Sequence, residues 1–239
     1  MDSMIIHLPS ATSRAAHVAK LCELLPNAQV VEAVNGADAI ATGEGHLAAG
    51  PVCAPRYPFA LSPGEVGCFL SHRSCWQRLA ESDADYALIV EDDFDIDPAA
   101  WAPAQRLVQA HGDVDSYIRL PAKPREKPVQ VIAEDSGARM FLPRRIGLQT
   151  VAQVVGRNAA TRLLAASPKL DRPVDAFLQM HWHTRQTIYT ILPSGVHERT
   201  AELGGSTIQS DTPAKAKLAR EIKRAVYRAK IATRPQTPR

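Results

Sequence analysis

Short apolar runs alternate along the chain with stretches in which apolar residues recur every three to four positions, the pattern of a layered α/β domain. The apolar runs predict strands at residues 4–8, 29–34, 86–90, 116–120, 148–155 and 187–192. Helical spacing occurs at residues 14–25, 62–81, 98–110, 159–166 and onward from 171. The opening order of strand, helix and strand predicts that the first two strands are parallel neighbours. We therefore expect an α/β fold with a Rossmann-type mixed, mainly parallel sheet that carries helices on both faces.

The helix predicted at residues 62–81 has an unusually clear start. Ser62 is suited to the cap, Pro63 to the first helical position, and Glu65 to the capping-box position. Its apolar residues form a broad face that predicts close packing against the sheet. His72 lies one turn before Trp76 on the same side. His72 is therefore either a core residue with a satisfied hydrogen bond or part of a binding site.

The strand predicted at residues 86–90 leads directly into three acids, Glu91, Asp92 and Asp93. Three neighbouring carboxylates repel one another, so a positive group is expected beside them. Ligands of open α/β sheets bind beyond the carboxyl ends of strands. The pattern predicts a hard cation, Mg²⁺ or Mn²⁺, that holds a phosphorylated ligand. The alternative is a solvated turn whose acids cap the next element.

Two long connections interrupt the regular pattern. Residues 42–61 are rich in Gly, Ala and Pro, without a consistent period, which is typical of a lid or a binding loop, or else of a disordered segment. Residues 121–145 mix prolines with Lys and Arg. They predict either a solvated surface hairpin or loop, or a basic rim beside a site for an anionic ligand.

Composition favours a soluble globular protein, since 45% of the 239 residues are apolar and 22% are charged. No apolar run approaches the length that spans a bilayer, and the N-terminus lacks a charged-then-apolar leader pattern. The four cysteines form no C-x-x-C pair, which favours reduced thiols over a zinc site or a disulfide framework. These features predict a cytoplasmic location.

Charge is distributed unevenly between residues 1–213 and 214–239. The whole chain carries +3, but nine Lys or Arg and one Glu follow from Ala214 onward, which leaves the preceding part at −5. We expect a globular domain over 1–213 and a basic amphipathic helix over 214–239. Such a helix suits the anionic inner face of the cytoplasmic membrane or an acidic partner, and the alternative is a solvated tail. Nucleic acid is not an expected partner, because the body is acidic and no binding motif is present.

Two kinds of metal-dependent chemistry fit an acidic strand end. In nucleotide-sugar transfer, a metal held by the acids stabilises the diphosphate as it leaves. In phosphoryl transfer by an aspartyl nucleophile, Asp93 and Asp95 would form a D-x-D start. The second kind would place the acids near the N-terminus and a Thr or Val soon afterwards, and this chain has neither. A metal-dependent phosphatase is therefore disfavoured.

The segment from Leu61 to His72, then Trp76, then residues 86–93, resembles glycosyltransferase family 25, the bacterial lipopolysaccharide and lipooligosaccharide galactosyltransferases related to collagen galactosyltransferases. The similarity extends over about residues 4–210. Residues 173–175 and 206–208 look like later motifs of the family. His7 is a departure, because an Asn is more usual there.

The resemblance implies a GT-A-like fold, Mn²⁺ (or Mg²⁺) as cofactor and a UDP-sugar as donor. It implies Glu91 and Asp93 as metal ligands, and Asp92 as a group that orients the donor sugar or ribose. Arg14 would contact the donor's diphosphate or base, and His72 would lie beside the donor. A late histidine could be the third metal ligand, with His197 as the candidate and His181 and His183 as competitors.

The resemblance also implies inversion at the anomeric carbon, for which a single general base suffices. Asp175 is the candidate base, with Asp115 and Glu65 as the other possibilities. The expected reaction moves a hexose, galactose before glucose, to a saccharide or glycolipid acceptor such as lipopolysaccharide core. A different class of function is a non-catalytic protein that binds nucleotide-sugar or membrane in an assembly pathway.

Overall fold

The computed structural model describes residues 1–199 and 214–238, so the predicted motif at residues 206–208 lies outside the described residues. Eight strands form one sheet in the order β2-β1-β3-β8-β5-β9-β7-β6. These strands are β1 (Asp2–His7), β2 (Ala28–Glu32), β3 (Tyr86–Glu91), β5 (Tyr117–Arg119), β6 (Pro128–Asp135), β7 (Ala138–Pro143), β8 (Ala152–Gly156) and β9 (Tyr189–Leu192). A second, two-stranded sheet pairs β4 (Phe94–Ile96) with β10 (Val196–Glu198).

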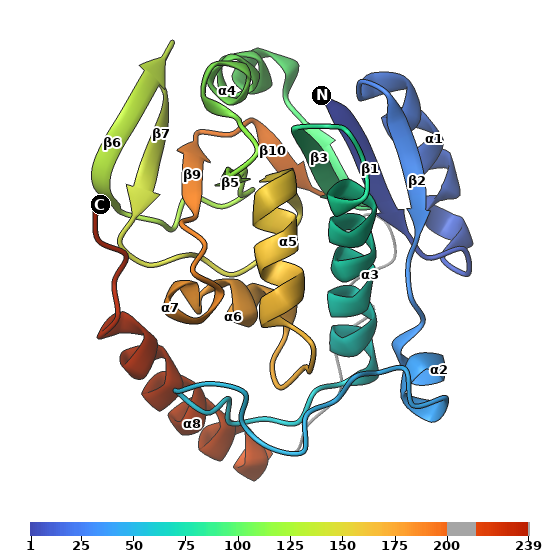
Figure 1. Cartoon of the computed structure of the whole chain (residues 1–239), viewed down its shortest axis with the longest axis vertical. Coiled ribbons are helices and arrows are strands. Elements are labelled where there is room, and N and C mark those ends of the chain that lie inside the picture. The colour runs from blue at the N-terminus through green and yellow to red at the C-terminus, as the bar shows by residue number, and fades with distance from the viewer. Residues whose placement is uncertain (200–213, 239) are drawn as a thin grey trace.

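Helices cover the sheet and connect its strands (Figure 1). They are the 3₁₀ turn η1 (Thr12–Arg14) and the α-helices α1 (Ala15–Leu24), α2 (Gly36–Ala41), α3 (Pro63–Ala80), α4 (Pro98–His111), α5 (Arg157–Ala166), α6 (Val174–Leu178), α7 (His181–Thr184) and α8 (Ala214–Ala232). No helix among the described residues is both long and apolar enough to cross a membrane.

The sheet is mixed, and most of its strands run in one direction. β2, β1 and β3 are parallel neighbours, as the opening strand, helix and strand predict. β8 is antiparallel to both β3 and β5, and β9 runs parallel to β5. The antiparallel β7 and β6 then complete the far edge. Only β8 and β7 oppose the other strands, so the predicted mainly parallel α/β sheet is confirmed.

Alternate residues of the central strands enter two separate cores, one on each face of the sheet. Ala87 and Ile89 of β3 face a core made with α3 and α5. Leu88 and Val90 face a core made with α1 and α4. All four side chains are fully buried, which explains why the strand reads as an uninterrupted apolar run. The prediction of helices on both faces is confirmed.

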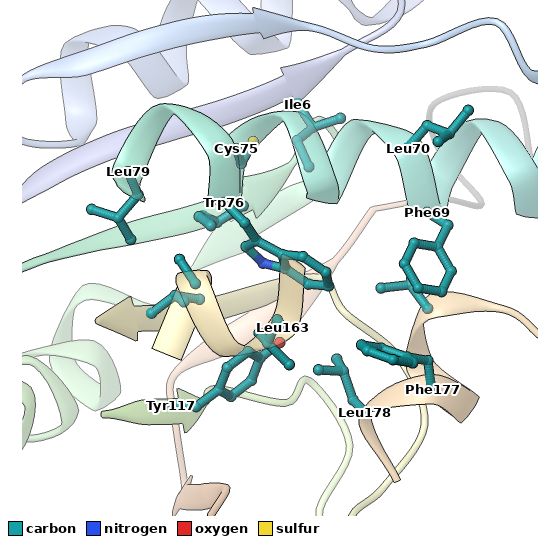
Figure 2. Close-up of a cluster of buried hydrophobic side chains, with 14 of the residues drawn as sticks. Ile6, Phe69, Leu70, Cys75, Trp76, Leu79, Tyr117, Leu163, Phe177 and Leu178 are labelled. Atoms are coloured by element: carbon teal, nitrogen blue, oxygen red, sulfur yellow. The ribbon is translucent and has the colours of Figure 1, made fainter. Parts of the chain in front are cut away.

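Helix α3 is the main element of the first core and begins where the sequence indicates. Ser62 caps it, and the Glu65 carboxylate returns to the Ser62 backbone N–H at 2.7 Å, which completes a capping box. Figure 2 shows the aromatic side of the helix, where Phe69 and Trp76 meet Phe177 of α6. Their ring centroids lie 5.1 to 6.3 Å apart. This packing fixes the position of α3 beside β3.

Helix α2 lies unusually close to α3, and two glycines permit this. A Cβ atom at Gly36 would stand 1.8 Å from the Pro63 carbonyl oxygen, and one at Gly67 would stand 2.5 Å from the Val34 carbonyl oxygen. Both contacts are with backbone, which cannot rotate away. Neither α2 nor this crossing was predicted from the apolar pattern.

The basic helix predicted at the C-terminus is present as α8, and it packs on the rest of the chain. Tyr227 and Ile231 are 7% and 3% exposed and form a small core with Met180. The Tyr227 hydroxyl accepts a hydrogen bond from the buried Arg172 at 3.3 Å, and its ring meets Tyr57 at 5.3 Å. In Figure 1, α8 runs along the segment that precedes α3. The long 42–61 connection is thus held between α8 and the body.

Candidate active site

One cavity of about 1200 Å³ lies beyond the end of β3. Its wall is built by segments that are distant in sequence: the end of β3, the loops that flank the β6–β7 hairpin, the start of α6, β10 and α8. The lining side chains discussed below are Arg14, Glu65, Cys68, Glu91, Asp93, Arg119, Lys123, Arg125, Glu126, Arg145, Gln149, Thr150, Asp175, His197, Glu198, Arg224, Tyr227 and Arg228.

The three acids after β3 separate into two environments. Glu91 and Asp93 line the cavity, whereas Asp92 does not. The Asp92 carboxylate is buried and pairs with His7 Nδ1 at 2.8 Å and with the Arg14 guanidinium. Arg14 also lies 3.8 Å from Asp93. The positive group expected beside the acids is therefore supplied in part by Arg14 of η1.

A chain of hydrogen bonds holds Glu91 from the core side. The Tyr117 hydroxyl donates to Gln153 Oε1, and Gln153 Nε2 donates to His72 Nδ1 at 2.8 Å. The proton of His72 then lies on Nε2, which donates to Glu91 Oε1 at 3.3 Å. Thr150 donates to the same oxygen at 2.6 Å. His72 is fully buried and is not among the cavity-lining residues, so it contacts Glu91 and not the cavity itself.

Burial alone would raise the pKa of Glu91, but the hydrogen bonds from His72 and Thr150 and the charge of Arg14 bring the pKa below its ordinary value. Glu91 is therefore an anion at neutral pH. Its other oxygen, Oε2, accepts no hydrogen bond from the described residues. One oxygen is thus held in place while the other is available to a ligand.

Asp175 lies at the start of α6, on the same cavity. Its carboxylate accepts hydrogen bonds from the backbone N–H groups of Ala176 at 2.6 Å and Gln149 at 3.3 Å. Burial raises the pKa of Asp175 above its ordinary value, and these two N–H groups offset only part of that effect. A carboxylate with a raised pKa is a better proton acceptor than an ordinary surface Asp.

The loop that holds Asp175 is organised by a buried ion pair. Arg119, at the end of β5, pairs with Glu126, and both side chains are nearly inaccessible. Arg119 also donates to the carbonyls of Leu148 and Gln149, each at 2.9 Å, and Glu126 accepts from the backbone N–H of Gly147. These contacts fix the segment from Gly147 to Gln149, and through Gln149 they position Asp175.

The late histidines lie in different places. His197 is exposed on β10 and lines the cavity. The β10–β4 pairing and the hydrogen bond from Arg199 N–H to the Asp93 carbonyl at 2.9 Å bring this strand beside the acids. His181 instead contacts the Arg234 carbonyl, and His183 contacts the Ala166 carbonyl. Neither of these two is among the lining residues.

The other two candidate bases are engaged elsewhere. Glu65 lines the cavity, but its carboxylate is bound to Ser62 in the capping box. Asp115 pairs with Arg162 at 2.8 Å and is not among the lining residues. Of the three carboxylates considered as bases, Asp175 is the one that lines the cavity without serving an ion pair or a helix cap.

Several site residues were not predicted from the sequence. Thr150 and Gln153 hold Glu91 directly or through His72, and Arg119 with Glu126 shapes the loop beside Asp175. A buried Gln within the apolar β8 was the available signal, because a buried polar side chain needs a partner. No local feature of the sequence indicated that α8 contributes to the wall of the cavity.

The donor chemistry of the site fits a hard divalent cation. Glu91 and Asp93 supply carboxylate oxygens, the ligands that Mg²⁺ and Mn²⁺ prefer, and His197 supplies an imidazole on the same cavity. Ligand atoms of Cys68, His72 and Glu91 also lie within 4.8 Å of one another. That grouping fits a metal less well, because burial raises the pKa of the Cys68 thiol well above its ordinary value and the His72 Nε2 proton faces Glu91.

The fold and the site define a Rossmann-like α/β domain whose cavity receives two carboxylates, Glu91 and Asp93, from the end of a central strand. A family model described as glycosyltransferase family 25 (LPS biosynthesis protein) matches residues 1–178. The chain therefore belongs to glycosyltransferase family 25, and the resemblance found in the sequence is confirmed.

Named relatives match at modest identity. A glycosyltransferase 25 family member of Drosophila pseudoobscura pseudoobscura is 32% identical over 128 residues, which is 52% of this chain and 20% of the relative. Human procollagen galactosyltransferase 2 is 29% identical over 54% of this chain and 21% of its own length. Mouse inactive glycosyltransferase 25 family member 3 is 30% identical over 69% of this chain and 29% of its own length. The chain thus spans between a fifth and a third of the relatives it matches.

Proposed function

We propose that this chain is a metal-dependent inverting glycosyltransferase that transfers a hexose, with galactose expected, from a UDP-sugar to a saccharide or glycolipid acceptor such as lipopolysaccharide core. The observation that carries the proposal is the meeting of Glu91, Asp93 and Asp175 on one cavity. Two of these acids suit a metal and the third suits a base. Membership of the family and the name of human procollagen galactosyltransferase 2 support a glycosyltransferase.

In this proposal Glu91 and Asp93 hold Mn²⁺ or Mg²⁺, and His197 is available as a further ligand. When bound, the metal stabilises the negative charge that develops on the departing UDP. His72 and Thr150 keep one oxygen of Glu91 fixed, so the other keeps its orientation toward the ligand. The Asp92 carboxylate pairs with the Arg14 guanidinium and forms a hydrogen bond with His7 Nδ1. These contacts assign Asp92 to holding the strand end together and make direct contact with the donor sugar less favourable.

Asp175 acts as the base. The acceptor hydroxyl oxygen attacks the anomeric carbon, the bond from that carbon to the UDP oxygen breaks, and the hydroxyl proton passes to the Asp175 carboxylate. A single displacement inverts the anomeric centre. The N–H groups of Ala176 and Gln149 orient the carboxylate for this transfer.

The test is Mn²⁺-dependent hydrolysis of a panel of UDP-sugars, together with UDP binding with and without Mn²⁺. Asp93→Ala should abolish metal-dependent UDP binding, and chelation of the metal should have the same effect on the unmodified protein. Asp95→Asn is the matched control, because this neighbouring carboxylate does not line the cavity. The enzyme proposal fails if no UDP-hexose is turned over and UDP binding shows no dependence on metal. Metal-dependent UDP binding without turnover would favour the non-catalytic alternative.

We further propose that α8 contacts an anionic membrane surface. Its outward side carries the exposed apolar Ile222 and Val226, 57% and 50% accessible, beside Lys223 and Lys230. Ile222→Ser with Val226→Ser should weaken sedimentation with phosphatidylglycerol vesicles and leave UDP binding intact. Unchanged sedimentation would contradict the membrane contact.

A further inference from the structure

The cavity carries a group of positive charges that the proposed reaction does not use. They come from the loop before β6, the loop after β7, and α8, and they are Lys123, Arg125, Arg145, Arg224 and Arg228. Two of them already have partners. Lys123 pairs with Glu198 at 3.1 Å, and Arg224 pairs with Glu221.

The other three, Arg125, Arg145 and Arg228, are exposed, and their side chains make no hydrogen bond or ion pair with any residue the structure describes. Like charges that share a cavity repel one another, and an anion placed among them relieves that repulsion. Guanidinium groups also match the geometry of phosphate and carboxylate oxygens with paired N–H donors.

Tertiary contacts bring these three arginines from separate segments. The backbone N–H of Arg144 donates to the Lys127 carbonyl at 2.9 Å, which places the residues on either side of the β6–β7 hairpin next to one another. The end of the chain attaches at the same point, where the Gln236 backbone N–H donates to the Arg144 carbonyl at 3.1 Å and its side chain donates to the Pro143 carbonyl at 3.2 Å. The loops that flank the hairpin therefore adjoin the chain end that follows α8. Because these loops and α8 also line the same cavity, we call them together the basic wall.

This wall belongs to a different part of the sheet from the acids. Three strands, β8, β5 and β9, stand between β3 and the hairpin strand β7. Figure 1 shows the hairpin and α8 on the side of the molecule away from β1 and β2. With the nucleotide-sugar diphosphate assigned to the metal at Glu91 and Asp93, the basic wall is left for the second substrate.

We propose that Arg125, Arg145 and Arg228 form a subsite for an anionic group, a phosphate or a carboxylate, on the acceptor saccharide. This proposal rests on the proposed glycosyltransferase function, since only a transferase needs an acceptor beside its donor. The subsite selects anionic acceptors over neutral ones. It would bind the same phosphate or carboxylate oxygens on a soluble saccharide or on a glycolipid headgroup.

The test compares glucose 6-phosphate and glucuronate with glucose as probes, by titration calorimetry or NMR, on the full chain saturated with UDP and Mn²⁺. The unmodified protein should bind at least one anionic probe about tenfold or more tightly than glucose. The triple variant Arg125→Gln, Arg145→Gln, Arg228→Gln should lose that preference and keep its UDP affinity. Arg144→Gln is the matched control, because Arg144 is exposed next to Arg145 but does not line the cavity.

Three results would overturn the subsite. The first is equal affinity for glucose and both anionic probes. The second is a parallel loss of UDP affinity in the triple variant, which would assign the arginines to the donor diphosphate. The third is a triple variant that no longer binds phosphatidylglycerol vesicles but keeps its affinity for the anionic probes, which would assign the three arginines to a membrane headgroup. Failure of the proposed function is distinguishable, because it would appear as absent Mn²⁺-dependent UDP binding in the unmodified protein.

Discussion

Replacement of His72 by leucine tests whether the hydrogen-bond chain behind Glu91 acts on the metal site. The imidazole donates to Glu91 and accepts from Gln153, and it is fully buried. Loss of a hydrogen bond to a charged acceptor costs about 1.5–3 kcal/mol, and an unpaired Gln153 amide costs about 1–3 kcal/mol more. We therefore expect His72→Leu to lower the free energy of unfolding by about 2.5–6 kcal/mol.

The functional effect should be separable from this loss of stability. Without the His72 donor, Glu91 is held by Thr150 alone, and outer partners of metal ligands are worth about 10–100-fold in metal affinity. We expect His72→Leu to weaken Mn²⁺-dependent UDP binding by about that factor, measured by calorimetry well below the Tm. His72→Gln keeps an N–H donor of similar reach and should recover most of the UDP affinity even where stability stays low.

Trp76→Phe is the control for stability alone. Trp76 lies one turn further along α3, is fully buried, and its indole Nε1 has no hydrogen-bond partner among the described residues. This variant should lower the Tm by packing loss and leave UDP binding unchanged. Equal weakening of UDP binding in Trp76→Phe and His72→Leu, or no recovery in His72→Gln, would refute a role of His72 in positioning Glu91.

Asp175→Asn should lower kcat by about 10²–10⁴-fold and spare UDP binding. Because burial raises the pKa of Asp175, the folded state binds the Asp175 proton more tightly than the unfolded state does, so stability falls as pH rises from the ordinary Asp pKa through the folded value. The Asn variant should therefore be more stable than the unmodified protein at neutral pH in thermal melts. An acidic limb of kcat/KM at the ordinary Asp pKa would contradict the assignment of Asp175 as the base. Asp92→Asn breaks the buried ion pair with Arg14 and should lower the free energy of unfolding by about 3–5 kcal/mol, measured by denaturant unfolding. An unchanged midpoint would contradict a stabilising role for this pair. Gly36→Ala should destabilise by about 1–3 kcal/mol through its clash with Pro63, whereas Gly50→Ala, which has open space around it, should have little effect on the same melts.

The sequence predicted the elements that depend on local patterns. The apolar run before Glu91 predicted a strand, and the Ser62 to Glu65 segment predicted the start of α3, because both signals lie within a few neighbouring residues. It also predicted the family through the same two segments. It did not predict α2, β4 or β10, which are short and carry weak periodicity.

The metal ligands and the base remain predictions, but the structure places them in one cavity and adds their partners. The sequence alone does not decide whether His72 is a core residue or a site residue. Its contacts show that both descriptions apply, because it is buried in the core and holds Glu91. The sequence could not specify Gln153 or Thr150 as partners, since they lie on and beside β8, about sixty residues from β3 along the chain.

The sequence by itself determined the α/β class, the capped α3 and the acids that follow β3, because backbone periodicity and caps act between near neighbours. The tertiary structure alone decided that Asp92 turns to Arg14 while Glu91 and Asp93 line the cavity, and that α8 closes the wall with Tyr227 and Arg228. These outcomes depend on contacts between segments far apart in the chain, such as Arg172 with Tyr227. No local propensity encodes them, because each contact is fixed by the packing of the whole sheet and its helices.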